Sequence, residues 1–403
     1  MIRKSARLLF LITVASFAAI TAQATAKPLK VFVLCGQSNM QGHAHVRTMD
    51  VIGLDPKTAP MLEAMRNADG SPKVLDDVWI SSIGSSEEEK TGQLTTGFGA
   101  DQRGPKIGPE LTFGIYMHKL LNEPILLIKT AWGGKSIHTD FRSPSAGPFP
   151  FSKEKLKQFT EKGKDVNQIK ADRAKATGNY YRLTIEHVKK VLADIKRVYP
   201  GYDAKQGHEL AGFVWFQGWN DMVAGDVYPE RGTPGGYDAY SEVLGHFIRD
   251  VRKDLEDPKL PFVIGVMGAG GPIDQYSEGK QRYAGVHGEF RKAMAAPAKL
   301  PEFKGNVAAV WTEKYWDMEL ETLRAKDKTL QNELKTLVKE GKLDKKEEKA
   351  ALEEKRTAAF SDREQQILEN GASNAEYHYL GSAKIIGGIG KGFAESLFEL
   401  MGK

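Results

Sequence analysis

The chain has 403 residues, of which 41% are hydrophobic and 27% are charged, so it has the length and composition of a globular protein with a full core. Its formal net charge is only +5 and no block of Lys and Arg stands out, which gives no indication of a nucleic-acid partner. The single cysteine, Cys35, excludes an intramolecular disulfide, so packing alone must hold the core.

The first 26 residues have the pattern of a secretory signal peptide. Arg3, Lys4 and Arg7 precede an apolar stretch over residues 8–20, and two Ala-x-Ala cleavage sites follow. We therefore expect residues 1–26 to be removed and the protein to be secreted or periplasmic. A retained membrane anchor is the alternative, but the stretch is too short to span a bilayer comfortably, so no stable membrane insertion is expected.

Five short apolar runs without polar alternation predict strands that are buried on both faces, as in a parallel sheet. These runs are Lys30–Cys35, Pro124–Ala131, Gly212–Gln217, Pro261–Met267 and Asn306–Thr312.

Amphipathic helical patterns separate most of these runs. They lie at residues 108–121, 181–195, 240–251 and 381–401. Strands that alternate with helices indicate βαβ units, and the predicted fold is an α/β three-layer α/β/α sandwich with about five parallel strands. Ligands of such sheets bind beyond the carboxyl ends of the strands.

Three segments extend this minimal fold. Residues 43–106 and 143–178 are rich in loop-forming residues and follow strand ends, so both are candidates for a substrate rim. Residues 320–370 are highly charged, with leucines at helical spacing and a break at "EGKLD", which predicts a projecting helical hairpin. We expect one domain over residues 27–403 with this hairpin inserted.

The predicted strands all end in polar residues, which a parallel sheet brings to one edge. The first ends in "GQSNMQG", where a tight strand-to-helix turn would project the hydroxyl of Ser38. A serine hydroxyl needs a general base, usually histidine, to act as a nucleophile. His378, in "SNAEYHYLGSA" before the last helix, is the best candidate because that loop should reach the same edge. Other histidines in nearby loops are alternatives that no spacing distinguishes, namely His43, His45, His138 and His287.

Four blocks, "GQSNMQG", "AWGGKS", "WFQGWND" and "SNAEYHYLGSA", occur in this order and resemble the SGNH-type hydrolases. The closer resemblance is to the sialate O-acetylesterase-like branch, which is also grouped as carbohydrate esterase family six. The resemblance implies a flavodoxin-like fold and hydrolysis of O-acetyl groups on carbohydrate.

The resemblance also assigns roles to individual residues. Ser38 matches the nucleophile and His378 the general base. One glycine of the pair Gly133 and Gly134, with Gly134 preferred, matches an oxyanion donor. Gln217 matches a further donor, although "GWND" also fits the broader SGNH pattern in which the asparagine, here Asn220, has that role.

Two positions depart from the family pattern. Trp219 stands where a glutamate usually follows Gln-Gly, and its ring could line an acyl or sugar pocket. Ala375 stands where an aspartate usually precedes the histidine by three residues. Either the enzyme uses a Ser-His dyad, or another acid, Asp317 or Glu376, orients the base.

We expect a carboxylic ester hydrolase that removes O-acetyl groups from an acetylated oligo- or polysaccharide, with no cofactor and no metal. Further candidate substrate-binding residues are Trp132, Gly133, Trp219, Asp140 and Arg142. Two alternatives are open: a carbohydrate-binding protein of the same fold without turnover, and an assembly protein that acts through the hairpin at 320–370.

Overall fold

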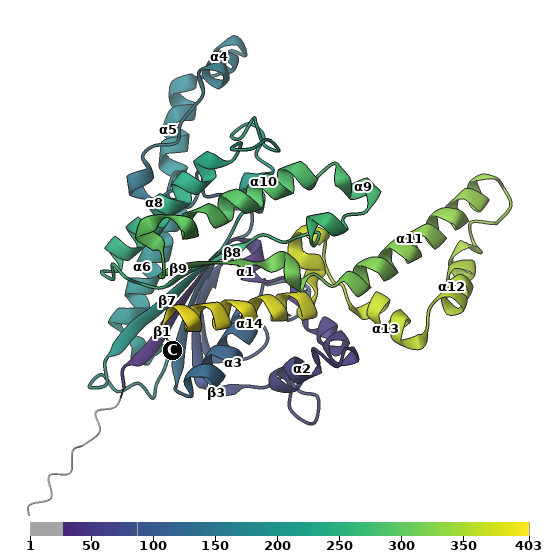
Figure 1. Ribbon diagram of the computed structural model, residues 1–403, viewed down its shortest axis with the longest axis horizontal. Helices are drawn as coiled ribbons and strands as arrows, with labels where there is room; N and C mark the ends of the chain where they lie inside the picture. The colour runs from purple at the N-terminus through teal and green to yellow at the C-terminus, as the bar shows by residue number, and fades with distance from the viewer. Residues whose placement is uncertain (1–26, 87, 403) are drawn as a thin grey trace, which may run out of the picture.

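The computed structural model describes residues 27–86 and 88–402 (Figure 1), so the expected signal peptide at 1–26 lies outside the described residues. A seven-stranded sheet has the order β4-β3-β6-β1-β7-β8-β9, and all neighbours are parallel except β3 and β4. Its strands are β1 (Leu29–Gly36), β3 (Leu75–Gly84), β4 (Lys90–Leu94), β6 (Ile125–Ala131), β7 (His208–Phe216), β8 (Phe262–Val266) and β9 (Val307–Trp311). Strands β2 (Ala44–His45) and β5 (Lys106–Ile107) pair separately.

All five apolar runs form strands, and together they have the order β6-β1-β7-β8-β9, which is the flavodoxin-like arrangement. The three-layer prediction is confirmed, but the sheet is wider than expected because β3 and β4 arise from the segment 43–106. Strand β3 contains Asp76, Asp77, Ser81 and Ser82, so its sequence lacks the continuous apolar run of a buried strand. Pairing with β6 on one side and β4 on the other satisfies its backbone.

Helices cover both faces of the sheet. The longer helices of the body are α3 (Glu110–Leu121), α6 (Asn179–Ala193), α8 (Asp238–Asp254), α10 (Ala284–Ala295) and α14 (Ala383–Leu400), and the short ones are α1 (Ser38–Gln41), α2 (Ala59–Met65), α7 (Trp219–Met222) and α9 (Glu278–Gln281).

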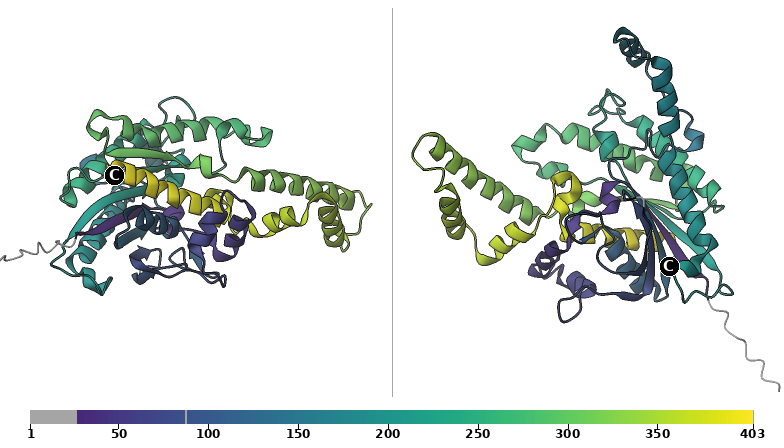
Figure 2. Two further views of the ribbon diagram at one scale, coloured as in Figure 1. Left: turned by 60° about the horizontal axis from the view of Figure 1, so that its bottom comes forward. Right: turned by 180° about the vertical axis from the view of Figure 1, so that it is seen from behind.

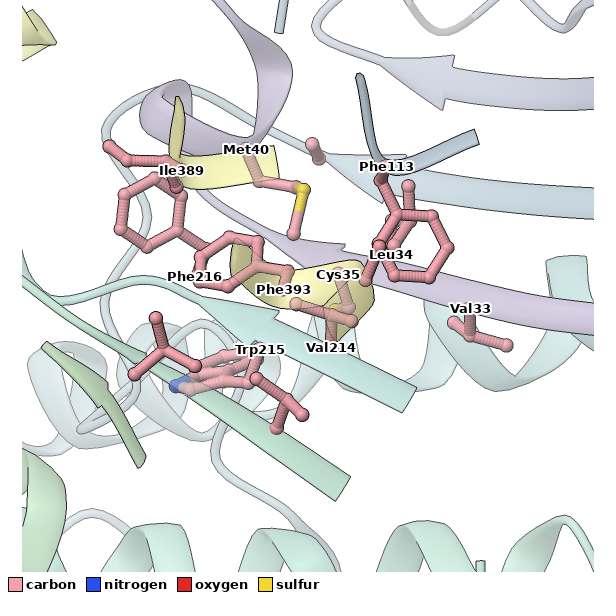
Figure 3. Packing of buried hydrophobic residues seen from close by; sticks show 14 of the residues in the cluster. Val33, Leu34, Cys35, Met40, Phe113, Val214, Trp215, Phe216, Ile389 and Phe393 are labelled. Atoms are coloured by element: carbon pink, nitrogen blue, oxygen red, sulfur yellow. The ribbon is translucent and has the colours of Figure 1, made fainter. Parts of the chain in front are cut away.

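Alternate residues of the central strands contact these two helix layers. Phe32 of β1 packs edge-on against Phe113 of α3, with ring centroids 5.6 Å apart, and Phe216 of β7 packs against Phe393 of α14 (Figure 3). On the opposite face, Cys35 Sγ lies 3.6 Å from the Thr184 hydroxyl of α6. Burial raises the pKa of the Cys35 thiol to about 12, so this cysteine serves as a core residue.

The central strand ends in a glycine that its two neighbours enclose. Gly36 pairs with Ala131 of β6 on one side and with Phe216 of β7 on the other. A Cβ atom at Gly36 would lie 2.1 Å from the carbonyl oxygen of Phe216, so no larger residue fits there. The residues that follow these three strands therefore begin at one level of the sheet edge.

Two helical arms project from the body (Figures 1 and 2). The first consists of α4 (Lys153–Glu161) and α5 (Val166–Ala176), neither of which has a buried side chain. The second consists of α11 (Met318–Lys339), α12 (Glu348–Ala359) and α13 (Asp362–Asn370), so three helices occupy the range expected to form a hairpin. A two-point ion pair between Arg356 and Asp327, at 2.7 and 2.8 Å, joins α12 to α11. Within the described part of the chain, no helix is both long and apolar enough to cross a membrane.

A buried ion pair lies beneath the sheet edge. Lys129 of β6 and Glu110 of α3 are 1% and 0% exposed in their side chains, and Lys129 Nζ lies 2.7 Å from Glu110 Oε2. The same ammonium donates to the carbonyl oxygens of Gln41 and Phe98 at 2.7 and 2.8 Å. Lys129 thereby ties the end of α1 to the loop that contains Phe98.

We predict that Lys129→Met lowers the free energy of unfolding by about 3–5 kcal/mol, because it leaves the Glu110 carboxylate buried without its partner. The double variant Lys129→Met/Glu110→Gln should lose less, since no unpaired charge remains. Urea denaturation checks both values, and Lys342→Met, which removes an exposed pair with Glu340, is the control with a change of about 0–1 kcal/mol. An equal loss in the single and double variants would contradict the ion-pair account.

Candidate active site

A cavity of about 460 Å³ opens at the carboxyl edge of the sheet. Five segments that are distant in sequence line it: Ser38, Gln41 and His43 after β1, Ser85 and Ser86 after β3, Gly133 and Gly134 after β6, Trp219 and Asn220 after β7, and Tyr377 and His378 before α14. The loop 100–102 completes its wall. The segment 143–178 does not contribute to this lining, although it was a candidate for the substrate rim.

Ser38 is the first residue of α1 and is 7% exposed. The preceding Gln37 donates from Nε2 to Ser38 Oγ at 3.4 Å and to Asn220 Oδ1 at 3.0 Å. The Gly218 N–H, which can only donate, contacts Gln37 Oε1 at 2.9 Å and so identifies the two ends of the Gln37 amide. The Ser38 hydroxyl accepts this weak hydrogen bond and keeps its own proton available.

The two candidate oxyanion donors from the third block have different surroundings. Gln217 is 2% exposed, and its Nε2 donates to Asp221 Oδ2, the Lys135 carbonyl and Gln37 Oε1 at 2.6, 3.0 and 3.2 Å. Asn220 lines the cavity and accepts from Gln37 with Oδ1. Its Nδ2 group has no protein partner among the described residues, so Asn220 has a donor available at the cavity and Gln217 does not.

The two glycines after β6 also differ. The N–H of Gly133 donates to Ser85 Oγ at 3.1 Å. Gly134 has a φ of +73°, a left-handed conformation that favours glycine, and a Cβ atom there would meet open space. Within the described chain the Gly134 N–H makes no hydrogen bond to protein, so it is the better placed donor of the pair.

One buried carboxylate holds this loop in place. Asp221 is 0% exposed and accepts from the backbone N–H groups of Ile137 and His138 at 2.9 and 3.1 Å. It also accepts from Gln217 Nε2 and from the Tyr228 hydroxyl. Burial raises the pKa of Asp221 even though these donors and the nearby His138 oppose the shift. Asp221 thus joins the turn after β7 to the loop that contains Gly133 and Gly134.

His378 lies in the 3₁₀ segment η8 (Glu376–Gly381) and is half-buried. Its Nδ1 lies 3.1 Å from Asn374 Oδ1, and its ring stacks on His43 with centroids 3.9 Å apart and an interplanar angle of 1°. Burial lowers the pKa of His378 to about 4. Burial, followed by the charge of His378, lowers that of His43 to about 3. Both imidazoles are therefore neutral at pH 7, and His378 is available as a base.

Ser38 and His378 line the same cavity, but no direct hydrogen bond joins Ser38 Oγ to the imidazole within residues 27–86 and 88–402. Catalytic hydrogen bonds are often long before a substrate binds. The absence of this hydrogen bond therefore does not remove either residue as a candidate.

The two candidate orienting acids have other partners. Asp317 accepts from the Leu320 N–H as the N-cap of α11 and lies 3.3 Å from Lys384 Nζ. Glu376 pairs with Lys280 at 3.0 Å. Neither carboxylate hydrogen-bonds His378, and neither lines the cavity.

The candidate substrate residues divide into two groups. Trp219 lines the cavity beside Tyr377, with ring centroids 5.6 Å apart, and the two rings form an aromatic wall. Trp132, Asp140 and Arg142 do not line the cavity. Trp132 is 3% exposed and packs on Tyr180, Asp140 accepts from Ser136 N and Oγ, and Arg142 donates to the carbonyls of Ala146 and Gly147.

Sequence reasoning did not identify Gln37, His43 or Asn374 as site residues. Gln37 lies inside the first block, and Asn374 lies one position before the usual aspartate, so position alone could have drawn attention to both. His43 was one of several loop histidines without a distinguishing spacing. Its role depends on the long-range contact with His378.

A serine hydroxyl, a neutral imidazole and two available N–H donors around one cavity are the groups that acyl transfer requires. Residues 28–301 match the family model of the carbohydrate esterases described as sialic acid-specific acetylesterases. The chain belongs to this family. The predicted family is thus confirmed, and the activity it supports is hydrolysis of acetyl esters. The match includes Ser38, Gly134 and Asn220, but it ends before His378.

Solved structures also resemble the chain at low sequence identity. No curated protein matches the chain. A protein from Arabidopsis thaliana is 17% identical over 71% of this chain and 86% of its own, with a TM-score of 0.36. A carbohydrate acetylesterase from Xanthomonas citri is 13% identical over 70% of this chain and 49% of its own, with a TM-score of 0.37. These similarities are too remote to carry an argument about this chain.

We predict that Asp221→Ala lowers the free energy of unfolding by at least about 2 kcal/mol, because it leaves several buried N–H and O–H groups without an acceptor. Asp226→Ala, an exposed change in the turn that follows α7, should stay within about 0.5 kcal/mol of the wild type. Urea denaturation measures both. Equal stabilities for the two variants would mean that Asp221 does not join the two loops.

Proposed function

We propose that this protein is a secreted serine esterase that removes O-acetyl groups from carbohydrate, with Ser38 as nucleophile and His378 as general base. The observation that carries the proposal is the common cavity, which Ser38, His378, Gly134 and Asn220 line from four separate segments. The family supports acetyl-ester hydrolysis, and the pattern of residues 1–26 supports export.

The reaction would proceed through an acetyl-enzyme. Ser38 Oγ attacks the acetyl carbonyl carbon while His378 Nε2 takes the hydroxyl proton. The tetrahedral intermediate then expels the sugar oxygen, which receives that proton from His378. Water attacks the acetyl-serine in the second half, His378 takes its proton and returns it to Ser38, and acetate leaves.

The negative charge of the tetrahedral oxygen needs preorganised donors. The backbone N–H groups of Ser38 and Gly134 and the Nδ2 group of Asn220 are the candidates, since each has no protein acceptor in the described chain. Gln217 and Asp221 would support these donors indirectly, because they hold the turn and the loop that present them.

The aromatic wall of Trp219 and Tyr377 supports a sugar ring as the alcohol part of the substrate. Tyr377 is 43% exposed, so a ring bound at the mouth of the cavity could pack on it without rearrangement. Ligand sites of this kind combine an apolar wall with a few polar groups that orient the ligand.

We predict that the wild-type protein releases acetate from p-nitrophenyl acetate and from acetylated polysaccharides, and that Ser38→Ala reduces this at least about a thousandfold because no acetyl-enzyme can form. Ser71→Ala, at an exposed serine that does not line the cavity, is the matched control and should change the rate less than about threefold. Equally inactive wild-type and Ser38→Ala proteins that still bind acetylated glycan would contradict the esterase and favour a binding protein.

The two oxyanion candidates are predicted to differ in what they affect. Asn220→Ala should lower kcat about 10²–10³-fold with little change in stability, because it removes a donor at the cavity. Gln217→Ala should lower the free energy of unfolding by about 1–3 kcal/mol, because its contacts are buried inside the protein. Steady-state kinetics and urea denaturation of both variants separate the roles, and the reverse pattern would assign the donor to Gln217.

A further inference from the structure

We propose that Asn374 is the positioning residue of the proposed catalytic base: its neutral side-chain oxygen takes the place of the usual carboxylate and holds His378 in the tautomer whose Nε2 can accept a proton. This inference rests on the proposed function. It replaces both open possibilities for the third member, an unassisted dyad and a distant acid, with a Ser-His-Asn arrangement.

A backbone neighbour fixes the orientation of the Asn374 amide. The backbone N–H of Ala375, which can only donate, lies 2.7 Å from the side-chain atom of Asn374 that also faces His378. That atom must therefore be the oxygen, Oδ1. Because Oδ1 accepts, His378 Nδ1 must carry a proton and donate it at 3.1 Å. In the neutral imidazole Nε2 is then unprotonated, which is the form that a general base requires.

The backbone around Asn374 and His378 forms a tight turn. Tyr379 and Leu380 have φ values of +52° and +59°, which is a costly conformation for residues other than glycine. This left-handed turn brings the Leu380 carbonyl back to the N–H of Asn374 at 2.9 Å, while the His378 N–H donates to the Ala375 carbonyl at 3.0 Å. These hydrogen bonds close a small loop over residues 374–380, and the closed loop brings the side chain of Asn374 into contact with His378.

Tyr379 anchors this turn to the sheet. The Tyr379 hydroxyl accepts from the Gly268 N–H at 2.8 Å and lies 2.7 Å from the Thr312 hydroxyl, so it is attached to the ends of β8 and β9. Tyr379 and Leu380 are 0% and 1% exposed. Burial of these two side chains offsets the backbone strain and makes the loop part of the core.

Among residues 27–86 and 88–402, no carboxylate hydrogen-bonds the His378 imidazole. His43 stacks on one face of the His378 ring, and Tyr377 packs edge-on at 4.4 Å. Asp101 lines the same cavity from the loop 100–102 but has no hydrogen bond to the imidazole in the described chain. The pKa of His378, lowered by burial to about 4, agrees with a base that has no ionised partner.

The experiment compares the wild-type chain with Asn374→Ala and Asn374→Asp, using p-nitrophenyl acetate over a range of pH. Asn374→Ala should lower kcat about 10²-fold with KM within about threefold, because the imidazole is free to rotate and change tautomer. Asn374→Asp keeps the acceptor and adds a negative charge, so it should keep most of the activity. It should also move the acid limb of kcat/KM up by at least about one pH unit, because a carboxylate raises the pKa of the histidine.

A second readout does not depend on turnover. Long-range ¹H–¹⁵N NMR of the full chain in the Ser38→Ala background should detect the Nδ1–H tautomer of His378 when Asn374 is present and a mixture of tautomers in Asn374→Ala. Suppose that the wild type shows Ser38-dependent activity and that both Asn374 variants keep its kinetics, pH profile and His378 tautomer. This result would overturn the role of Asn374 and leave the proposed function intact. A wild type without Ser38-dependent activity would instead overturn the proposed function, and the tautomer would still test Asn374.

Discussion

The position of Gly36 between its two neighbouring strands determines the site. Because Gly36 pairs with both Ala131 and Phe216, the residues after β1, β6 and β7 start from one level of the sheet. The Phe216 carbonyl leaves no room for a side chain at Gly36, so the strands approach closely at this point. A flavodoxin-like sheet places its ligand crevice beside the central strand, and here that strand leads directly into Ser38.

Amide groups make up most of the polar framework around the cavity. Gln37 joins the turn before Ser38 to Asn220, and Gln217 joins the same turn to Asp221. A side-chain amide can donate and accept at the same time. The Gly218 N–H therefore fixes which end of the Gln37 amide accepts, and the donating end of Gln37 in turn fixes the orientation of the Asn220 amide. Asp221 is the charged end of this chain, and its burial is tolerated because four donors surround it.

Much of the fold and some of the site could be predicted from local patterns. The apolar runs predicted the five central strands, and the polar residues at their ends predicted the edge that holds the cavity. Strand β3 was not predicted because polar residues interrupt its apolar pattern, namely Asp76, Asp77, Ser81 and Ser82. Trp132, Asp140 and Arg142 were expected at the substrate, yet Trp132 packs on Tyr180 of α6, and Asp140 and Arg142 hydrogen-bond within the loop after β6. The role of the arm at 320–370 in assembly stays a prediction.

The sequence by itself determined the five central strands and the polar turns that follow them, and it predicted Ser38 and His378 as the pair of groups for acyl transfer. These features depend on short-range periodicity and on residue chemistry. Only the tertiary structure decided which donors are available and which residue contacts His378. From the sequence, Asn220 and Gln217 are equally suitable as oxyanion donors. In the structure, the side-chain N–H groups of Gln217 donate to buried protein acceptors and are not available to a substrate. Asn374 contacts His378 because Tyr379 and Leu380 adopt a strained turn, and only packing against β8 and β9 makes that turn stable.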